Sequence, residues 1–261
     1  MSKYETLVNE RYDAVALVEL NRPDNSNSLN ETLAEELATV AAELDADPSV
    51  RAVVLTGRGR FFCAGGDVKA MGGFGDHAAV RVKRLADEAH RAVSTFTRMR
   101  APLVVAVNGM AAGGGFSIAM TGDLVLAAES ASFTMAYTQV GLSPDGSSSW
   151  FLPRLVGMRK AQELFFTNRR LTAQEALEWG LVHRVVDDGS LRSEALAVAS
   201  TLAAGPTNSH AAIKTLLAAT FGNGLETQME LEGRLIAQCA GSPGGQEGIA
   251  AFVAKRPPRF P

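Results

Sequence analysis

Two glycine-rich turns are the feature of this chain that points most directly to chemistry. Residues 62–67 (FCAGGD) follow the apolar run 52–56, and residues 108–115 (NGMAAGGG) follow the apolar run 103–107. Each pattern predicts a buried strand, a turn of bare backbone and then a helix. Glycine lets a ligand approach free backbone N–H groups, and two such turns can direct two N–H donors at one oxygen. The turns therefore predict an oxyanion hole.

Nucleotide phosphates are the other ligands that turns of this kind bind. A Walker A loop ends in Gly-Lys-Ser/Thr, and neither turn has this ending. The Rossmann pattern Gly-x-Gly-x-x-Gly does not fit the run Gly113-Gly114-Gly115. Both nucleotide interpretations are therefore disfavoured, whereas tight packing of backbone against backbone stays open as a structural role for the glycines.

Composition indicates a soluble protein with a sizeable core and no basic footprint for nucleic acid. The chain has 261 residues, is 46% hydrophobic and 20% charged, and has a formal net charge of −3. No apolar run has the length of a membrane span, and the first residues lack the apolar segment of a secretory signal. Cys63 and Cys239 show no metal-ligand spacing. We expect a cytoplasmic protein without a metal site and without a nucleic-acid or membrane partner.

The order of predicted elements is typical of an α/β fold followed by helices. Apolar patterns predict strands at 4–9, 13–20, 52–56, 103–107, 124–127 and 132–134. They predict a helix through about residue 45 with Asn30 as its N-cap, and further helices at 77–99 and 114–121. Beyond Pro144 only helices are expected, at 146–155, 158–167, 172–179, 190–204, 206–221, 224–240 and 244–254. Gly205-Pro206 divides an α/β core, 1–204, from a helical segment, 205–261.

Several segments together carry a resemblance to a known family. They are 21–23 (NRP) with Leu29-Asn30, 62–69 (FCAGGDVK), 102–109 (PLVVAVNG), 112–115 (AGGG), 171–176 (LTAQEA), 179–182 (WGLV) and 247–256 (EGIAAFVAKR). Over essentially its whole length the chain resembles the crotonase (enoyl-CoA hydratase/isomerase) superfamily. The resemblance implies a spiral of β-β-α turns, with a helical C-terminal segment that forms a homotrimer or a dimer of trimers. It also implies an acyl-CoA thioester substrate and no further cofactor, because coenzyme A is part of the substrate.

The resemblance assigns the oxyanion donors to the backbone N–H groups of Gly66 and Gly114. Removing a proton beside a thioester, or adding a nucleophile, puts negative charge on the carbonyl oxygen. Fixed donors in a water-poor site stabilise that charge, and losing one typically costs about 3–4 kcal/mol of transition-state stabilisation. Gly114 begins a predicted helix, whose dipole adds to the effect.

For coenzyme A itself, the resemblance implies a site built largely from backbone. Atoms around Asn27, Phe62 and Ala64 would hold the adenine and pantetheine parts, and Phe252 and Lys255 would reach the coenzyme A of a neighbouring subunit. Lys255 lies beside Arg256 and supplies positive charge for phosphates. A solvated helix end, with basic side chains complementing the dipole, is the alternative role for this pair.

Hydratases of this family use two glutamates to position water, and this chain has neither. The matching positions hold Ser117, three residues after Gly114, and Tyr137. Serine cannot act as the acid, and a tyrosine with a pKa near about 10 is a poor base at neutral pH. Hydratase activity would therefore need another residue.

Asp145 is the carboxylate that the chain offers instead. Its loop resembles that of the ring-opening enoyl-CoA isomerases of phenylacetate breakdown, in which the matching aspartate moves a proton between carbons. Capping the helix that starts near Ser147 is the structural alternative. We favour an isomerase in which Asp145 removes a proton and returns it elsewhere, shifting a double bond.

Two rival functions stay open. Asp145 also matches the nucleophile of the 4-chlorobenzoyl-CoA dehalogenases, where His90 would activate water and where a tryptophan takes the place of Tyr137. The other rival is a catalytically silent homologue that binds acyl-CoA or RNA. The acidic charge balance argues against RNA.

Overall fold

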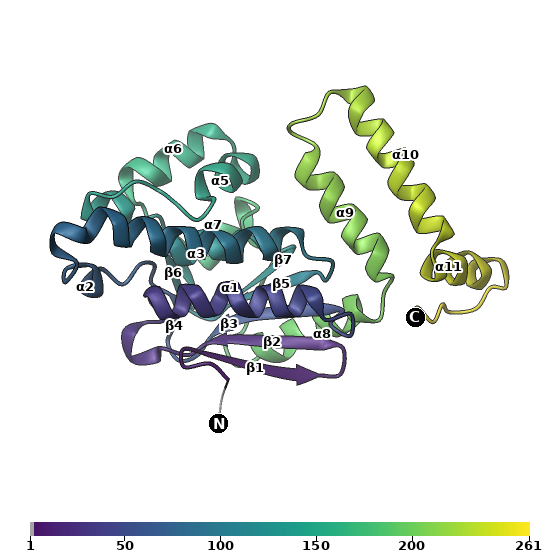
Figure 1. The fold of residues 1–261 in the computed structure, drawn as a ribbon, viewed down its shortest axis with the longest axis horizontal. Helices are drawn as coiled ribbons and strands as arrows, with labels where there is room; N and C mark the ends of the chain where they lie inside the picture. Colours follow the sequence, from purple (N-terminus) through teal and green to yellow (C-terminus); the bar gives the residue numbers. More distant parts are fainter. Residues whose placement is uncertain (1–2) are drawn as a thin grey trace.

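The computed structural model describes residues 3–261 and consists of two β-sheets wrapped by helices, with a helical arm at the C-terminal end (Figure 1). The strands are β1 (Leu7–Tyr12), β2 (Val15–Leu20), β3 (Ala52–Gly57), β4 (Phe61–Cys63), β5 (Leu103–Val107), β6 (Met110–Ala112), β7 (Leu124–Ala128), β8 (Ser132–Thr134), β9 (Leu171–Thr172) and β10 (Arg184–Val186). One sheet has the order β1-β2-β3-β5-β7-β10 and the other β4-β6-β8-β9. The predicted α/β class is confirmed.

The helices lie close to their predicted bounds. They are α1 (Glu31–Ala46), α2 (Val68–Met71), α3 (Ala78–Arg98), α4 (Gly114–Ala119), α5 (Ser148–Val156), α6 (Met158–Thr167), α7 (Ala173–Glu178), α8 (Leu191–Ala203), α9 (Thr207–Ala219), α10 (Leu225–Gly241) and α11 (Pro243–Val253), with 3-10 turns η1 (Pro23–Asn25), η2 (Gly75–His77) and η3 (Tyr137–Val140). Asn30 caps α1 as predicted, because its side chain accepts from the Leu33 N–H. Among residues 3–261, no helix has the length and apolar character to cross a membrane.

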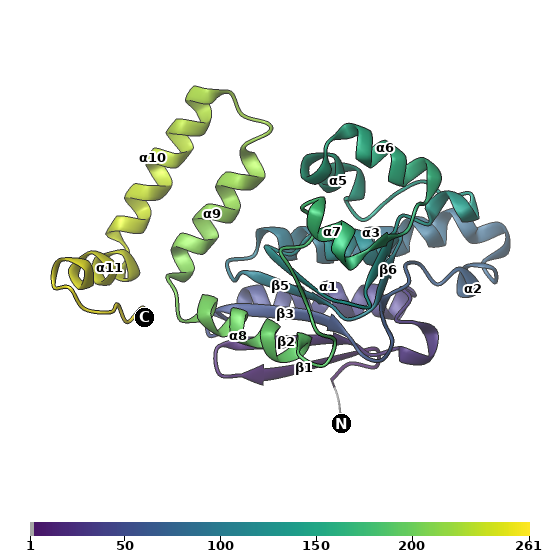
Figure 2. The same cartoon turned by 180° about the vertical axis from the view of Figure 1, so that it is seen from behind.

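A repeated β-β-α unit generates the spiral expected from the family resemblance. In the pairs β3–β4, β5–β6 and β7–β8, the first strand joins the six-stranded sheet and the second joins the four-stranded sheet. Every residue of β2, β3 and β5 is buried, because α1 lies on one side of the sheet and α8 on the other (Figures 1 and 2). Parallel pairing of β3 with β5 places their carboxyl ends at the same edge.

Three strand predictions are wrong in instructive ways. The first hairpin turns two residues later than predicted, because Tyr12 pairs with Val15 and Asp13 takes a φ of +51° in the turn. The glycine turns do not follow β3 and β5 directly, since the short strands β4 and β6 intervene. The segment beyond Pro144 is not all helical: β9 and β10 are two- and three-residue edge strands whose pairing partners, β8 and β7, lie far away in sequence.

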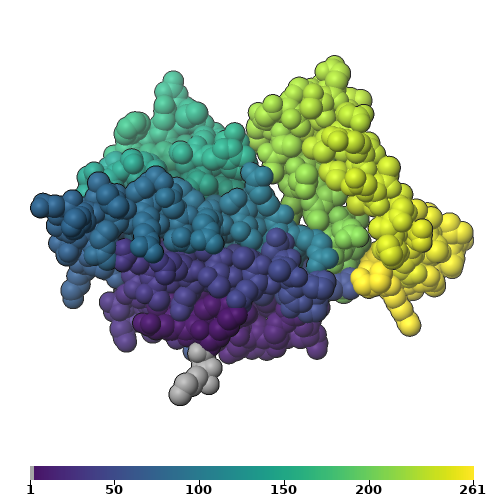
Figure 3. Space-filling view, in the orientation of Figure 1, coloured from purple at the N-terminus to yellow at the C-terminus, as the bar shows by residue number. Residues whose placement is uncertain are grey.

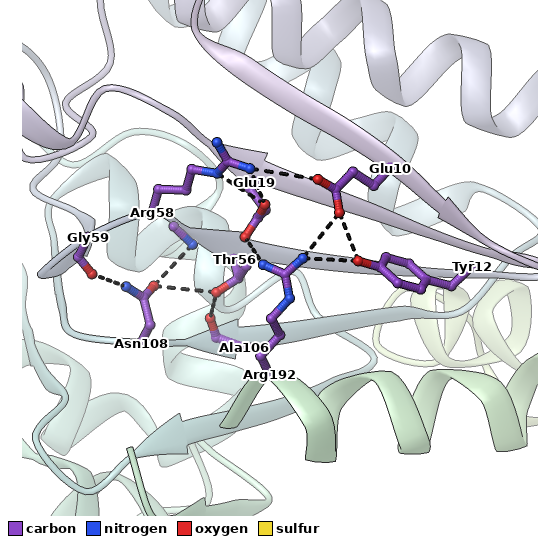
Figure 4. A network of polar contacts seen from close by, with 10 residues as sticks. Glu10, Tyr12, Glu19, Thr56, Arg58, Gly59, Ala106, Asn108 and Arg192 are labelled. Atoms are coloured by element: carbon purple, nitrogen blue, oxygen red, sulfur yellow. Dashed lines mark hydrogen bonds and ion pairs between the residues drawn. The ribbon is translucent and has the colours of Figure 1, made fainter. Parts of the chain in front are cut away.

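A polar network fixes the ends of the central strands (Figure 4). Glu19 of β2 is only 3% exposed, and it accepts from Arg58 at 3.0 Å and from Arg192 of α8 at 2.6 Å. Asn108 accepts from the Gly57 N–H at 3.0 Å and donates to the Gly59 carbonyl at 2.9 Å. The chain segments that lead into the two glycine turns are thereby tied to each other.

The arm formed by α9, α10 and α11 lies to one side of the α/β body (Figure 1). An ion pair between Lys214 and Asp123 joins the arm to the body. Lys214 of α9 is 8% exposed and donates to the Asp123 carboxylate at 2.6 Å and to the Phe96 carbonyl at 2.9 Å. Asp123 also accepts from the Leu103 N–H, so the pair joins the arm to the start of β5. Burial lowers the pKa of Lys214, although the negative charge of Asp123 opposes that shift.

Replacing Lys214 with methionine should lower the free energy of unfolding by about 1.5–3 kcal/mol, because the partly exposed Asp123 carboxylate loses a charged hydrogen-bond donor. The shift of the urea midpoint measures the loss. Lys69→Met, at an exposed lysine of α2, is the matched control and should change stability by less than about 0.5 kcal/mol. Equal stability of the two variants would contradict the anchoring role of Lys214.

Candidate active site

The two glycine turns pack backbone against backbone. A Cβ added at Gly65, which has a φ of +91°, would lie 2.8 Å from the Ala112 carbonyl oxygen. A Cβ at Gly115 would lie 2.1 Å from the Cys63 carbonyl oxygen. No other residue fits between the turns at these points. The structural role of the glycines is therefore confirmed, and it brings the two turns into direct contact.

The two predicted oxyanion donors line one cavity. Within residues 3–261, neither the Gly66 N–H nor the Gly114 N–H donates a hydrogen bond. Gly114 is the first residue of α4, where an N–H has no partner inside the helix. Both glycines line a cavity of about 500 Å³ that also contains Asp145 and Tyr137. The structure therefore brings together two unpaired donors, a carboxylate and a phenol.

The rest of the cavity is mainly apolar. Its walls come from Leu29, from α2, from one face of α3, from α4 and from the loop after η3, through Val68, Met71, Leu85, Ala89, Val93, Ile118, Val140 and Leu142. Lys83 of α3 also lines it, and its ammonium pairs with Asp87. Such a site suits the hydrocarbon part of an acyl group.

Asp145 is held by hydrogen bonds on its side chain and its backbone. Its Oδ1 accepts from the Tyr137 hydroxyl at 2.7 Å. Its carbonyl oxygen accepts from the Ser148 hydroxyl at 2.8 Å and lies 3.0 Å from the Ser117 Oγ. Within residues 3–261, nothing donates to Oδ2, and the Asp145 side chain caps no helix because Ser147 holds the N-cap position of α5. One carboxylate oxygen thus stays free for a substrate.

The structure leaves no room for a glutamate at position 117, the position that matches the first hydratase glutamate. Ser117 is completely buried, and a Cβ added at Gly146 would lie 2.8 Å from the Ser117 Cβ. Gly146 takes a φ of +61°, which lets the loop after Asp145 lie directly on Ser117. A longer side chain at position 117 would displace this loop. Neither the contact with Gly146 nor the part played by buried Ser148 was predicted from the sequence.

Tyr137 occupies the second glutamate position and serves as a donor. Its hydroxyl lies 2.8 Å from the Ser117 Oγ and donates to Asp145. Burial, followed by the negative charge of Asp145, raises the pKa of Tyr137 far above its usual value. The phenol therefore keeps its proton throughout the physiological range, as expected for a residue that cannot serve as the base.

His90 reaches the same loop from α3 but does not line the cavity. Its Nε2 accepts from the Gly146 N–H at 3.0 Å, and the imidazole is exposed. A ring nitrogen that accepts from a backbone N–H uses its lone pair there, so the ring proton sits on Nδ1. In this arrangement His90 supports the Asp145–Gly146 peptide, and its Nε2 is not free to take a proton from water.

The residues expected around coenzyme A fall into two groups. Asn27 is fully buried and its side chain is occupied, accepting from the Arg22 N–H and donating to the carbonyls of Arg58 and Phe61. Phe62 is a core residue, and Ala64 lines the cavity. Phe252 of α11 is 86% exposed, and Lys255 follows it at the end of the arm remote from α2 (Figure 1). Their binding roles stay predictions.

Comparison with known proteins identifies the family. The model of the enoyl-CoA hydratase/isomerase family matches residues 10–261. The chain is 37% identical over 250 residues to 1,2-epoxyphenylacetyl-CoA isomerase of Escherichia coli, covering 94% of both chains. It is 35% identical over 249 residues to 4-chlorobenzoyl coenzyme A dehalogenase-2 of Arthrobacter sp, covering 94% of this chain and 90% of that one.

A solved structure agrees with these matches. An enoyl-CoA hydratase from Polaromonas sp. JS666 superposes with a TM-score of 0.93 at 33% identity, covering 98% of this chain and 99% of that one. The sequence matches and the structural match thus indicate the same family. The chain belongs to the enoyl-CoA hydratase/isomerase family.

Proposed function

We propose that the protein is an acyl-CoA isomerase that shifts a β,γ double bond to the α,β position. The observation that carries this proposal is that Asp145 is the only carboxylate side chain among the described residues that line the cavity. A double-bond shift needs one group that accepts a proton and then donates it. The similarity to 1,2-epoxyphenylacetyl-CoA isomerase of Escherichia coli makes 1,2-epoxyphenylacetyl-CoA a further substrate to test.

The chemical step uses only the groups in the cavity. Asp145 Oδ2 takes a proton from the α carbon, and the electrons of the broken C–H bond form a dienolate whose charge rests on the thioester oxygen. The N–H groups of Gly66 and Gly114 stabilise this oxyanion. The carbonyl then re-forms, the double bond moves to the α,β position, and the γ carbon takes the proton from Asp145. No electrons are gained or lost overall.

Hydration is disfavoured because there is too little space around Ser117 for a glutamate. Adding water across a double bond in this family uses two carboxylates, and the contact between Gly146 and Ser117 leaves no room for the first. Tyr137, at the other position, keeps its proton. Another residue would have to position the water, and the described cavity lining offers only Gln139 and Ser143 as further uncharged polar side chains besides Tyr137.

Dehalogenation of an aryl-CoA is the second candidate, favoured by the similarity to the Arthrobacter dehalogenase and by the closeness of His90 to Asp145. Asp145 would attack the halogenated ring carbon, and the carbon–halogen bond would break with release of halide as the aryl ester forms. Water would then cleave this ester, giving the hydroxylated aryl-CoA and the free carboxylate. The bond from the Gly146 N–H to His90 Nε2 counts against this route, because that nitrogen would have to activate the water.

A product assay separates the candidates. Purified protein is incubated with a β,γ-enoyl-CoA, an α,β-enoyl-CoA and 4-chlorobenzoyl-CoA, and the products are identified by mass and NMR. The proposal expects an α,β-enoyl-CoA from the first substrate. A hydroxyacyl-CoA, or chloride release, would instead assign hydratase or dehalogenase activity. Binding without turnover of any of them would indicate a silent acyl-CoA-binding protein.

We also propose that residues 205–261 form an oligomerisation segment and that the chain assembles as a trimer. Nine large apolar side chains of the arm are each more than half exposed: Ile213, Leu217, Phe221, Leu225, Met229, Ile236, Ile249, Phe252 and Val253. A second cavity of about 460 Å³, almost wholly apolar, lies between α5 and α9, where Figure 3 shows the arm set apart from the body. An apolar surface this extensive is typical of an interface. Phe252 and Lys255 could then reach the coenzyme A of a neighbour.

Light scattering after size exclusion should give the mass of three copies of the 27.5 kDa chain, or of six. Ile236→Glu should shift the mass toward the monomer, because it places a charge in the apolar surface of α10. Val80→Glu, at an exposed valine of α3, is the matched control and should leave the mass unchanged. A monomeric parent protein would overturn the oligomer proposal.

A further inference from the structure

The two positions that lack the hydratase glutamates are joined to Asp145 by a chain of hydroxyl groups. The Ser117 Oγ lies 2.8 Å from the Tyr137 hydroxyl, which lies 2.7 Å from Asp145 Oδ1. Ser117 is fully buried and Tyr137 is 8% exposed, so little water competes for these bonds. Three side chains from α4, η3 and the loop before α5 thus form one connected network.

The order of the protons along this network follows from the charge at its end. A carboxylate is the strongest acceptor present, so the single Tyr137 proton points at Asp145. The Tyr137 oxygen is then free to accept from Ser117, whose single hydroxyl proton has this oxygen, at 2.8 Å, as its nearest acceptor. The carbonyl oxygens of Asp145 and Gly113 lie farther from the Ser117 Oγ, at 3.0 and 3.2 Å. In this order each donor polarises the next, and the bond that reaches Asp145 is stronger than an isolated phenol–carboxylate bond.

The bond to Tyr137 is the principal polar contact of the Asp145 side chain within the described residues. Three further titratable groups lie nearby, all from α3. His90 binds the Gly146 N–H, while Lys83 and Asp87 pair with each other at the cavity wall. Within the described residues, none of them forms a hydrogen bond or ion pair with the Asp145 carboxylate. The charged form of Asp145 is therefore stabilised mainly through Tyr137.

We propose that Ser117 and Tyr137 are positioning residues of the isomerase, which hold one oxygen of Asp145 and aim the other at the substrate. The inference rests on the proposed function, because it presumes that Asp145 carries the proton. In place of the two glutamates stands a chain of hydroxyl donors that fixes a single carboxylate.

Tyr137→Phe removes the hydroxyl that contacts Asp145 and keeps the aromatic ring. We expect kcat for the double-bond shift to fall roughly 10- to 100-fold with little change in KM, the scale of losing a hydrogen bond to a charged group. A tyrosine with a merely structural role would alter KM or the unfolding temperature rather than kcat alone.

Ser117→Ala removes the hydroxyl at the other end of the network, which contacts Tyr137. Its effect should have the same sign and be smaller, about 3- to 10-fold in kcat, because it removes only the group that polarises Tyr137. Combined with Tyr137→Phe it should add almost nothing, since the two residues act in series. Tyr12→Phe, at a 41% exposed tyrosine of β1, is the matched control and should leave both kcat and KM unchanged.

The outcomes separate this inference from the function on which it rests. If Asp145→Asn is inactive but Tyr137→Phe keeps the parent kcat, the donor chain is refuted and the isomerase proposal stands. If Asp145→Asn remains active, the proton shuttle itself fails. Additive losses in the double variant would also overturn the serial arrangement. Thermal unfolding of each variant establishes that the fold is retained.

Discussion

Asp145→Asn should lower isomerase turnover by about 10³-fold, within the range for loss of a positioned acid–base group. Asparagine has nearly the same shape and its Oδ1 still accepts from Tyr137, so the loop keeps its position. The amide cannot take a proton from the α carbon. Initial rates with a β,γ-enoyl-CoA measure the loss, and equilibrium binding of a saturated acyl-CoA should change less than about threefold because no binding donor is removed.

Asp76→Asn is the matched control for that prediction. Asp76 lies in η2 at an exposed position outside the cavity lining, so its replacement should leave turnover unchanged. Turnover by Asp145→Asn above about a tenth of the parent rate would be too high for a variant without its proton carrier. That result would move the catalytic assignment to another residue.

The second large effect concerns the oxyanion hole. Gly113 precedes the donor Gly114 and takes a φ of +48° with a ψ of −124°, a conformation that L residues avoid. A Cβ there meets no atom closer than 3.5 Å, so Gly113→Ala strains the backbone without a collision. The relaxed backbone turns the peptide that carries the Gly114 N–H away from the substrate oxygen. We expect kcat to fall by about 10²- to 10³-fold, the scale of one lost oxyanion donor.

Gly180→Ala separates this catalytic effect from backbone strain in general. Gly180 has a φ of +76°, and an added Cβ would meet nothing within 4 Å. Both variants should lose about 1–2 kcal/mol of unfolding free energy, since each places an alanine in left-handed backbone. Only Gly113→Ala should lose turnover. Equal turnover of the two variants would argue that the Gly114 N–H does not stabilise charge in the transition state.

The sequence carried strong information about the glycine turns and less about their surroundings. An apolar run followed by glycines is a local pattern, and Asn30 is a local cap signal; the structure confirms both features. The contact between Gly115 and Cys63 depends on how two distant turns meet. Nothing in either segment alone encodes that distance.

The candidate site, too, was predictable from the sequence only in part. Asp145 was singled out through the family resemblance, and its line of contacts to Tyr137 and Ser117 spans 28 residues of sequence. Such a network depends on α4 and η3 meeting across the cavity. The edge strands β9 and β10 escaped prediction because two or three residues are too few to show a periodic pattern.

The most direct test of the proton shuttle follows one labelled proton. A β,γ-enoyl-CoA deuterated at the α carbon is converted in ordinary water, and the product is examined by NMR. A proton shuttle through Asp145 predicts an α,β-enoyl-CoA in which part of the deuterium has moved to the γ carbon, and about 10³-fold slower formation of this product by Asp145→Asn. A product hydroxylated by water, or undiminished deuterium transfer in Asp145→Asn, would contradict it.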